Sequence, residues 1–178
     1  MMTFLLFVVM VIAGFLYSSP WEWTLHRFVM HRPVGKFDYP FKKHALEHHR
    51  IFKANSTYTL QKEEDKWTIP MAWWNGPVLI LIATAMISPL AWQVDRWWSI
   101  LAVGCGITLY YAMYEYIHWC MHLPKNGERF VERLWIFHRL NAHHLLHHRH
   151  MNRNFNVVLP LADWCFGTLL SPSQESLK

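Results

Sequence analysis

The fold is decided by residues 67–114, which read WTIPMAWWNGPVLILIATAMISPLAWQVDRWWSILAVGCGITLYYAMY. Two uncharged runs, 67–94 and 97–114, are separated only by Asp95 and Arg96. A helix needs about 20 apolar residues to cross the hydrocarbon core of a bilayer, and each run is near that length. The stretch therefore predicts a helical hairpin in a membrane, with spans at about 70–92 and 97–117.

A third apolar segment lies at the N-terminus. Residues 1–21 carry no charge, and the first basic side chain follows at Arg27. A signal peptide would begin with a basic region, so we expect an uncleaved span at about 3–20 with its N-terminus outside. Three crossings result, or four if the second apolar run is broken or a re-entrant piece lies near the C-terminus. The last apolar stretch, 155–170, is short and interrupted, and we do not expect it to span.

The polar parts of the chain fall on one side of the membrane in this threading. All but one of the 17 Lys and Arg lie in 22–66 and 118–178, the exception being Arg96. Positively charged loops face the cytoplasm, so we expect both parts on the cytoplasmic side of a bacterial inner membrane or the endoplasmic reticulum. The predicted fold is one all-α integral membrane domain over 1–178, a small transmembrane helical bundle of three to four spans with a cytosolic histidine-rich helical cap.

The composition excludes several classes of protein. With 53% hydrophobic and only 16% charged residues, the chain is not disordered, and its aromatic content of 16% is high for a soluble domain. The net charge of +5 comes from scattered basic residues, which argues against nucleic acid as a partner. The three cysteines form no CxxC motif, so neither a disulfide framework nor a thiolate metal site is expected.

The 13 histidines form four clusters outside the apolar spans. In the predicted threading all four clusters meet at the cytoplasmic mouth of the helices, as a metal site requires. The clusters are His26 and His31; His44, His48 and His49; His118 and His122; and His138, His143, His144, His147, His148 and His150.

Helical geometry indicates which histidines can share a face. His118 and His122 form an i, i+4 pair at the end of the third span, suited to one divalent ion. His44 and His48 have the same spacing, and the adjacent His49 can turn toward a second ion. Two of the four clusters thus each offer a well-spaced pair.

The other two clusters are less well defined. His26 and His31 are five residues apart and diverge by about 140° on an ideal α-helix, so they serve different ions or lie where the helix ends. His138 fits neither of the two possible stripes of the last cluster. These stripes, of which only one can face the centre, are His144, His147 and His148, or His143, His147 and His150.

So many imidazoles exceed the needs of one ion, and two ions are the natural number. The nearby acids are Glu47, Glu115 and Asp163. Imidazole suits iron, copper, nickel and zinc, and open positions on iron permit oxygen chemistry, whereas a hydrolytic zinc site needs only about three ligands. A metal transporter would place ligands near the middle of its spans. The predicted spans contain no such histidines, so a histidine-rich metal transport or binding protein is the weaker alternative.

The chain resembles the membrane fatty acid hydroxylase and sterol desaturase superfamily in nearly all of its length beyond the first span. The resemblance is carried by HRFVMH (26–31), HALEHH (44–49), HWCMH (118–122), HHLLHH (143–148) and NFNVVLPLADWCFGT (154–168). The sequence departs from the family pattern once, because its second box is HxxxHH instead of HxxHH. The role of His44 is therefore the least secure.

The resemblance implies an O₂-dependent diiron oxygenase that hydroxylates a C–H bond of a lipid or fatty acyl chain. It implies two iron ions, which zinc can replace on overproduction, and an external ferredoxin- or cytochrome-type electron donor. A lipid desaturase and a carotenoid hydroxylase are alternatives on the same scaffold, but the third box is HxxxH and not the longer HxxxxH, which favours acyl or sterol-like substrates. The implied ligands are His26, His31, His44, His118 and His122 for one ion, and His48, His49, His144, His147 and His148 for the other.

Overall fold

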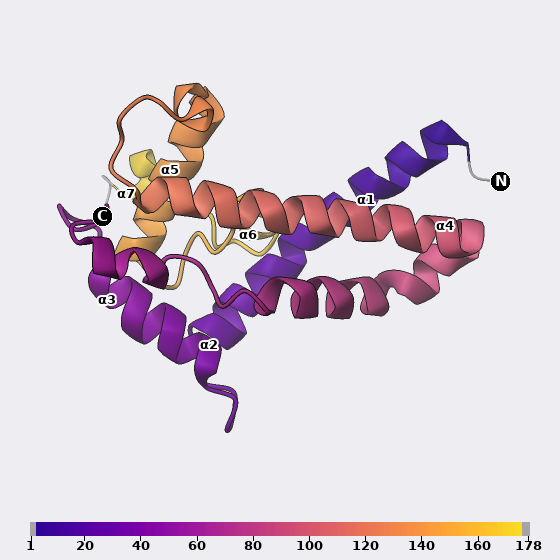
Figure 1. The fold of residues 1–178 in the computed structure, drawn as a ribbon, viewed down its shortest axis with the longest axis horizontal. Helices are drawn as coiled ribbons and strands as arrows, with labels where there is room; N and C mark the ends of the chain where they lie inside the picture. Colours follow the sequence, from indigo (N-terminus) through magenta and orange to yellow (C-terminus); the bar gives the residue numbers. More distant parts are fainter. Residues whose placement is uncertain (1–2, 176–178) are drawn as a thin grey trace.

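The computed structural model describes residues 3–175, which fold into an elongated assembly of helices (Figure 1). Within this range no strand is present, which confirms the all-α prediction. The elements in chain order are α1 (Phe4–Leu25), the π-helix η1 (His26–Met30), α2 (Tyr39–Phe41), the π-helix η2 (Lys42–His48), α3 (His49–Ile51), the 3-10 helix η3 (Glu63–Thr68), α4 (Asn75–His122), the 3-10 helix η4 (Phe130–Arg133), α5 (Trp135–Arg149), α6 (Leu161–Cys165) and α7 (Pro172–Glu175).

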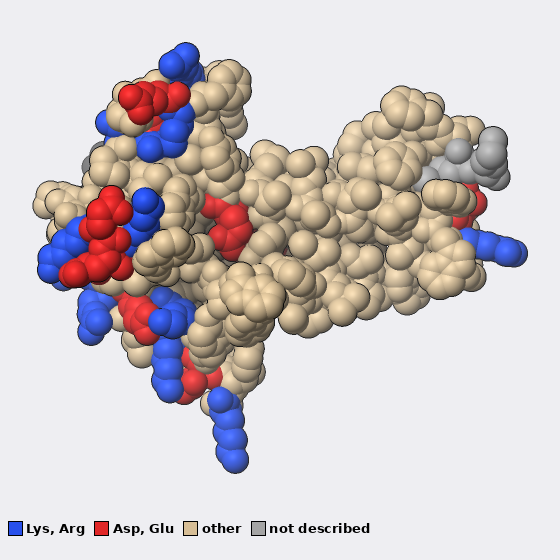
Figure 2. All heavy atoms as spheres, in the orientation of Figure 1, with Lys and Arg blue, Asp and Glu red and all other residues tan. Residues whose placement is uncertain are grey.

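Two helices, α1 and α4, are long and apolar enough to cross a membrane. Their large apolar side chains point outward, and Leu81 and Leu90 are 70% and 69% exposed. The core helix of a soluble protein would bury such residues. Figure 2 shows that charged side chains gather at the end of the molecule that holds α2, α3 and α5, whereas the long middle of this face is almost free of charge. This distribution fits a membrane-spanning part that is formed by α1 and α4 and surrounded by lipid, which we call the shaft.

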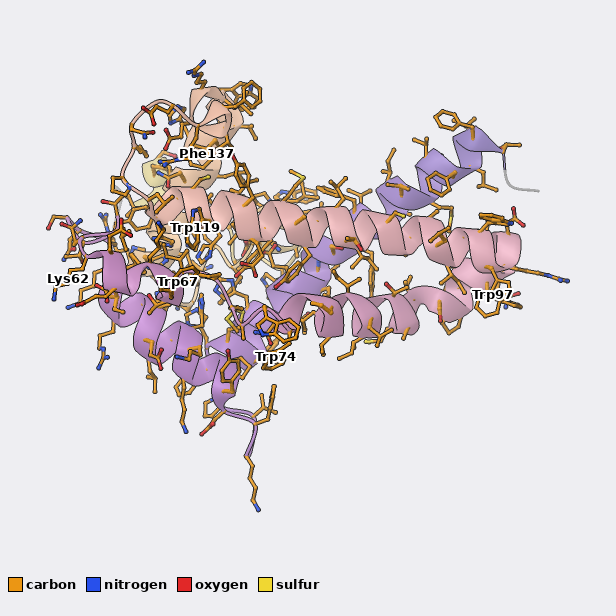
Figure 3. The ribbon with its side chains drawn as sticks, in the orientation of Figure 1. Lys62, Trp67, Trp74, Trp97, Trp119 and Phe137 are labelled. Atoms are coloured by element: carbon orange, nitrogen blue, oxygen red, sulfur yellow. The ribbon has the colours of Figure 1, made fainter. Side chains whose placement is uncertain are left out.

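The long helix α4 consists of two antiparallel arms, 75–94 and 97–122, that fold back on each other (Figure 1). The turn lies at Asp95 (φ −150°, ψ 49°) and Arg96 (φ 46°, ψ −126°), whose backbone angles are not helical. The predicted turn at these two residues is therefore confirmed. In Figure 3, Trp74 and Trp97 mark the two ends of the first arm.

The boundaries of the helices differ from the predicted spans. The first arm begins at Asn75 and not near residue 70, which leaves Pro70 in the loop and Pro77 in the first turn, where a missing N–H costs little. The second arm runs on to His122, five residues beyond the predicted end. Helix α1 continues past Pro20, because a membrane helix tolerates a proline that removes a single hydrogen bond.

Helix α1 crosses the second arm of α4 at two glycines, Gly14 and Gly106. A side chain at Gly106 would overlap the backbone carbonyl of Val11, and one at Gly14 would overlap the carbonyl of Val103. Small residues that let two backbones approach closely are the usual means of packing helices in membranes. The contact fixes the end of α1, and with it the start of η1, relative to α4.

The cap, which is the charged end of the molecule that holds α2, α3 and α5, is stabilised by small apolar cores and by the C-terminal segment. One core joins the end of α4 to α5 through Met121, Phe137 and Leu140. Stretch 155–170 contains only the five-residue helix α6, which is too short to cross a bilayer as a helix. It is tied to α1 by hydrogen bonds, among them one from the Ser19 hydroxyl to the Leu159 carbonyl (2.7 Å).

Candidate metal centre

The structure gathers all ten predicted ligand residues into two compact groups inside the cap. Within each group, the possible ligand atoms of five histidines lie within 4.8 Å of one another. Group one is His26, His31, His44, His49 and His147, and group two is His48, His118, His122, His144 and His148.

The type of helix decides which histidines meet in group one. His31 donates its backbone N–H to the carbonyl of His26 (3.1 Å), and His49 donates to the carbonyl of His44. These i, i+5 bonds define π-helical turns, in which residues five apart lie on one face. Of the two alternatives stated for His26 and His31, the second is present, because His31 lies directly after the end of η1 at Met30. The i, i+5 bond brings both residues into group one, whereas α-helical turns would separate them. The same i, i+5 geometry pairs His44 with His49 in group one. The side chain of His48, which lies between them in sequence, belongs to group two.

Group two is built mainly on α-helices. His118 and His122 on α4, and His144 and His148 on α5, are i, i+4 pairs whose rings face a common centre. The fifth member, His48, approaches His122, with ring centroids 4.7 Å apart. The pairing expected for α4 from sequence is therefore present in the structure.

The open choice in the last cluster is also resolved in the structure. The stripe that faces the groups is His144, His147 and His148. His143 instead forms an ion pair with Asp163 (Nε2–Oδ2 3.3 Å), and the half-buried His150 belongs to neither group. His138 is exposed on the outer face of α5.

The division of the ten histidines differs from the one that the resemblance implied. The expected set placed His118 and His122 with His26, whereas the structure puts His49 and His147 there. The reason is geometric, because the ends of α4 and α5 lie together and their paired histidines share one centre. The second box (His44, His48 and His49) and the fourth box (His144, His147 and His148) thus each contribute histidines to both groups.

The nitrogens that face each other have a spacing that suits a cation. The Nε2 atoms of His26 and His44 are 2.8 Å apart. The Nε2 atom of His144 lies 3.2 Å from Nε2 of His122 and 3.0 Å from Nε2 of His148. Two nitrogens bound at right angles to one ion, each at about 2.1 Å, would be about 3.0 Å apart. The Nε2 atoms of His48 and His118 are buried without a hydrogen-bond partner. The residues present therefore fit a metal ion in each group.

Backbone carbonyls hold the opposite nitrogen of five of these rings. A ring that donates its Nδ1–H to a carbonyl keeps the lone pair of Nε2 for a metal and is fixed in orientation. In group one the acceptors are the carbonyls of Phe155 for His26 and Arg153 for His147, and in group two they are the carbonyls of Thr68 for His48, Tyr58 for His122 and Phe52 for His148. The two groups thus depend on different loops, 153–157 for the first and 52–68 for the second.

Burial keeps the rings neutral. Burial, with a contribution from the His147 ring, lowers the pKa of His31 to about 3. Burial also lowers the pKa of His147 to about 4, against the hydrogen bond to the Arg153 carbonyl. Neutral imidazole is the form that binds metals, so the groups are ready to do so at pH 7.

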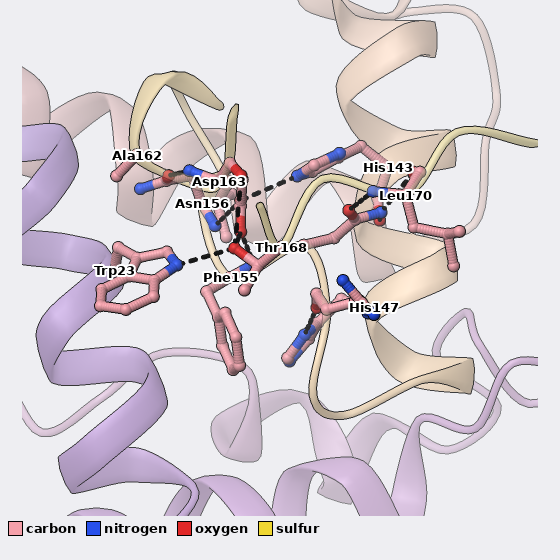
Figure 4. Close-up of polar contacts among 12 residues, drawn as sticks. Trp23, His143, His147, Phe155, Asn156, Ala162, Asp163, Thr168 and Leu170 are labelled. Atoms are coloured by element: carbon pink, nitrogen blue, oxygen red, sulfur yellow. Dashed lines mark hydrogen bonds and ion pairs between the residues drawn. The ribbon is translucent and has the colours of Figure 1, made fainter. Parts of the chain in front are cut away.

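The three acids noted in the sequence belong to neither group. Glu47 is paired with Lys43 at the surface (2.6 Å), and Glu115 accepts a hydrogen bond from the Tyr111 hydroxyl (2.7 Å). Asp163 is fully buried and orders the loop that carries the group-one carbonyls (Figure 4).

Asp163 is the centre of a buried hydrogen-bond network that the sequence did not predict. Its carboxylate accepts hydrogen bonds from the backbone N–H groups of Phe155 (2.9 Å) and Asn156 (2.7 Å) and from the Thr168 hydroxyl (2.6 Å). Burial raises the pKa of this carboxyl, but the bonds from His143, Thr168 and Asn156 outweigh it, so the net pKa is lowered and the charge persists. The signals in the sequence are the separate polar residues Asn156, Asp163 and Thr168 within the otherwise apolar stretch 155–170, which overlaps the motif that carries the resemblance.

An apolar cavity of about 310 Å³ lies between α1, η1 and the arms of α4, and it reaches His26. A second cavity of about 640 Å³ reaches His44, His48 and His118. Tyr111, Tyr114, Glu115 and Met71 line both, so the two cavities adjoin. Of the four tyrosines of this region, Tyr110, Tyr111 and Tyr114 line the apolar cavity, and Tyr116 is exposed instead.

Fold and site together define the class of a membrane hydroxylase: an all-helical protein whose buried histidine groups open onto an apolar cavity beside a lipid-facing shaft. The family model for "Fatty acid hydroxylase" matches residues 11–168, and the chain belongs to this family. It is therefore an oxidoreductase that acts at a membrane.

Two curated relatives are consistent with this assignment. They are the beta-carotene hydroxylases of Paracoccus sp. strain PC1 and Paracoccus sp. strain N81106 / MBIC 01143, each 26% identical over 169 residues, which cover 94% of this chain and 86% of the relative. No solved structure matches the chain significantly.

Proposed function

We propose that the protein is an O₂-dependent diiron oxygenase that hydroxylates a C–H bond of a lipid. The observation that carries this proposal is the pair of five-histidine groups beside two adjoining cavities, of which the apolar one reaches His26 and the other reaches His44, His48 and His118. Ten neutral imidazoles without a carboxylate in either group suit two divalent ions of the first transition row. A metal transport protein is a poorer fit, because both groups lie in the cap instead of halfway along the shaft.

The ten histidines of groups one and two are the proposed ligands. Two iron ions bound there would supply the activation of O₂, with electrons from a ferredoxin- or cytochrome-type donor; zinc can occupy the same sites on overproduction. The protein contributes orientation through the carbonyl-bound Nδ1 atoms, and its apolar walls exclude water from the reacting C–H bond.

The substrate is proposed to enter sideways from the bilayer into the apolar cavity. The wall of this cavity is mostly apolar, with Val78, Ile82 and Ile107 among its residues, and the carboxyl groups in it are those of Glu22 and Glu115. The hydrocarbon end of the substrate therefore enters, and a polar head stays at the membrane surface. An acyl or sterol-like chain fits this description. The names of the Paracoccus relatives favour a carotenoid as the second candidate.

We further propose three crossings, by α1 and the two arms of α4, with the cap in the cytoplasm. The basic residues support this orientation, since Arg96 at the far turn is the one Lys or Arg outside the polar segments 22–66 and 118–178. The cap would then face the cytoplasm, where it could receive both iron(II) and electrons from a donor protein.

Metal content per chain is the measurement that tests the site. Purified protein is expected to hold close to two ions, and His147→Ala (group one) and His148→Ala (group two) are each expected to lower this to about one, because each removes one of five ligands that act together. Both variants are expected to lose hydroxylated product.

His138→Ala is the matched control, since His138 lies on the same helix but outside both groups. It should keep two ions and full activity. A metal content near zero in the parent protein, or one unchanged by the first two substitutions, contradicts the dimetal site. Metal flux across vesicles that is lost in the variants and needs no O₂ would support the transporter instead.

A further inference from the structure

A third recess, of about 650 Å³, lies on the surface of the cap beside group one. It is lined by Arg27, Arg32 and Arg149, and His31 and Phe155 also contribute to its wall. No carboxylate is among the side chains that the structure places around it. Three positive charges therefore face one opening.

Two of the recess arginines, Arg27 and Arg32, differ in their partners from basic residues elsewhere on the cap. The side chains of Lys42 and Lys43 form ion pairs with acids four residues away at 2.7 and 2.6 Å. In contrast, among the described residues Arg27 and Arg32 form no ion pair, and their guanidinium groups lie over the rings of Trp23 (4.9 Å) and Phe28 (5.6 Å). A positive patch of this kind attracts an acidic partner and speeds its encounter.

The recess is also the place where the metal centre comes closest to solvent. Of the ten group members His31 alone is half-buried, whereas the other nine are at most 8% exposed, and Nε2 of His31 lies 3.1 Å from Nε2 of His147 in group one. Leu46 and Met151, which line the same opening, are 49% and 52% exposed. A small apolar contact area within a ring of cations suits a short-lived protein complex.

Hydroxylation needs electrons from outside the substrate. When one oxygen atom of O₂ enters a C–H bond, the other is reduced to water, which consumes two electrons and two protons. The proposed function therefore needs a carrier that delivers both electrons near the metal centre.

We propose that the recess formed by Arg27, Arg32 and Arg149 is the docking surface for an acidic one-electron carrier protein, and that electrons enter at His31 into group one. The inference rests on the proposed oxygenase function and names the place where its donor binds. The carrier would give up one electron at each of two visits, and a metal ion held by group one would accept it.

The test measures binding of an acidic [2Fe–2S] ferredoxin to the metal-loaded protein in detergent. The double variant Arg32→Glu/Arg149→Glu is expected to weaken this binding about tenfold and to reduce its dependence on salt. Both side chains are exposed, so the metal content should remain that of the parent protein. Product formation with ferredoxin should fall, whereas product formation with a small chemical reductant should not change.

The matched control is Lys62→Glu/Lys125→Glu, which changes the net charge equally at two exposed residues outside the recess. The proposal is overturned if the control weakens ferredoxin binding as much, or if the recess variant binds ferredoxin normally. Loss of binding to phosphatidylglycerol vesicles with normal ferredoxin binding would identify the recess as a lipid head-group site and overturn it too. Absence of product with either reductant would contradict the oxygenase function, while the binding result would still decide the docking surface.

Discussion

Gly106→Ala is expected to yield a protein whose α1 no longer packs against α4. The added methyl group would overlap the backbone carbonyl of Val11, and a backbone cannot rotate away as a side chain can. Overpacking of this kind costs about 1–3 kcal/mol, which corresponds to a lower Tm by roughly 5–10 °C. Because α1 carries the start of η1, the separation also displaces His26. Thermal denaturation in detergent and metal content are the two measurements.

Gly104→Ala is the control for this prediction. It lies on the same arm of α4, and an added Cβ would be 3.6 Å from the Thr84 side chain, an ordinary contact. Alanine also has the higher helix propensity, by about 1 kcal/mol. This variant should therefore be at least as stable as the parent. Equal destabilisation by the two substitutions would mean that the close approach of α1 to α4 is not what positions the helix.

The second large effect is expected from Asp163→Asn, which should empty group one and leave group two occupied. The amide has one acceptor oxygen where the carboxylate had two, so its NH₂ would face the backbone N–H of either Phe155 or Asn156. A buried donor left unpaired in this way costs about 1–3 kcal/mol. The loop then releases the carbonyls of Phe155 and Arg153, which orient His26 and His147. Loss of such support typically weakens metal binding by about 10- to 100-fold.

Double variants identify the group that loses its ion. Asp163→Asn combined with His148→Ala is expected to hold close to no metal, whereas Asp163→Asn combined with His147→Ala should still hold about one ion. Glu132→Gln is the matched control, because Glu132 is another buried carboxylate that accepts a backbone N–H, from Gly127 at 3.0 Å, but it touches neither group. An equal loss of metal from both groups in Asp163→Asn would show that Asp163 supports the fold in general and not group one.

Much of the site could be predicted because its signals are local. The spacing of His118 and His122 identifies a pair on an α-helix, and the helix is α-helical there. Asp95 and Arg96 are charged residues between two apolar runs, and a turn at the membrane surface is their natural place. The set of ten histidines was implied by the resemblance to the hydroxylase and desaturase superfamily, because spacing alone left the last cluster open.

The division into two groups could not be predicted from spacing alone. His26 and His31 share a face only because η1 is a π-helix, and the sequence does not indicate the i, i+5 bonds that form it. The carbonyl acceptors were beyond prediction for a different reason, since every residue has a carbonyl and only the tertiary fold selects one.

The two kinds of helical turn bear on the order in which the protein is assembled. The pairs of group two sit on α-helices that form as soon as α4 and α5 pack, so their ligands are arranged in advance. The pairs of group one lie on π-helical turns, which are rare and less favourable than α-helical turns. A bound metal ion would stabilise these turns by binding both histidines of a pair. Uptake is therefore expected to be sequential, with a stable one-ion intermediate rather than a mixture. Calorimetric titration of the metal-free protein should resolve two steps, and His148→Ala should remove the tighter one.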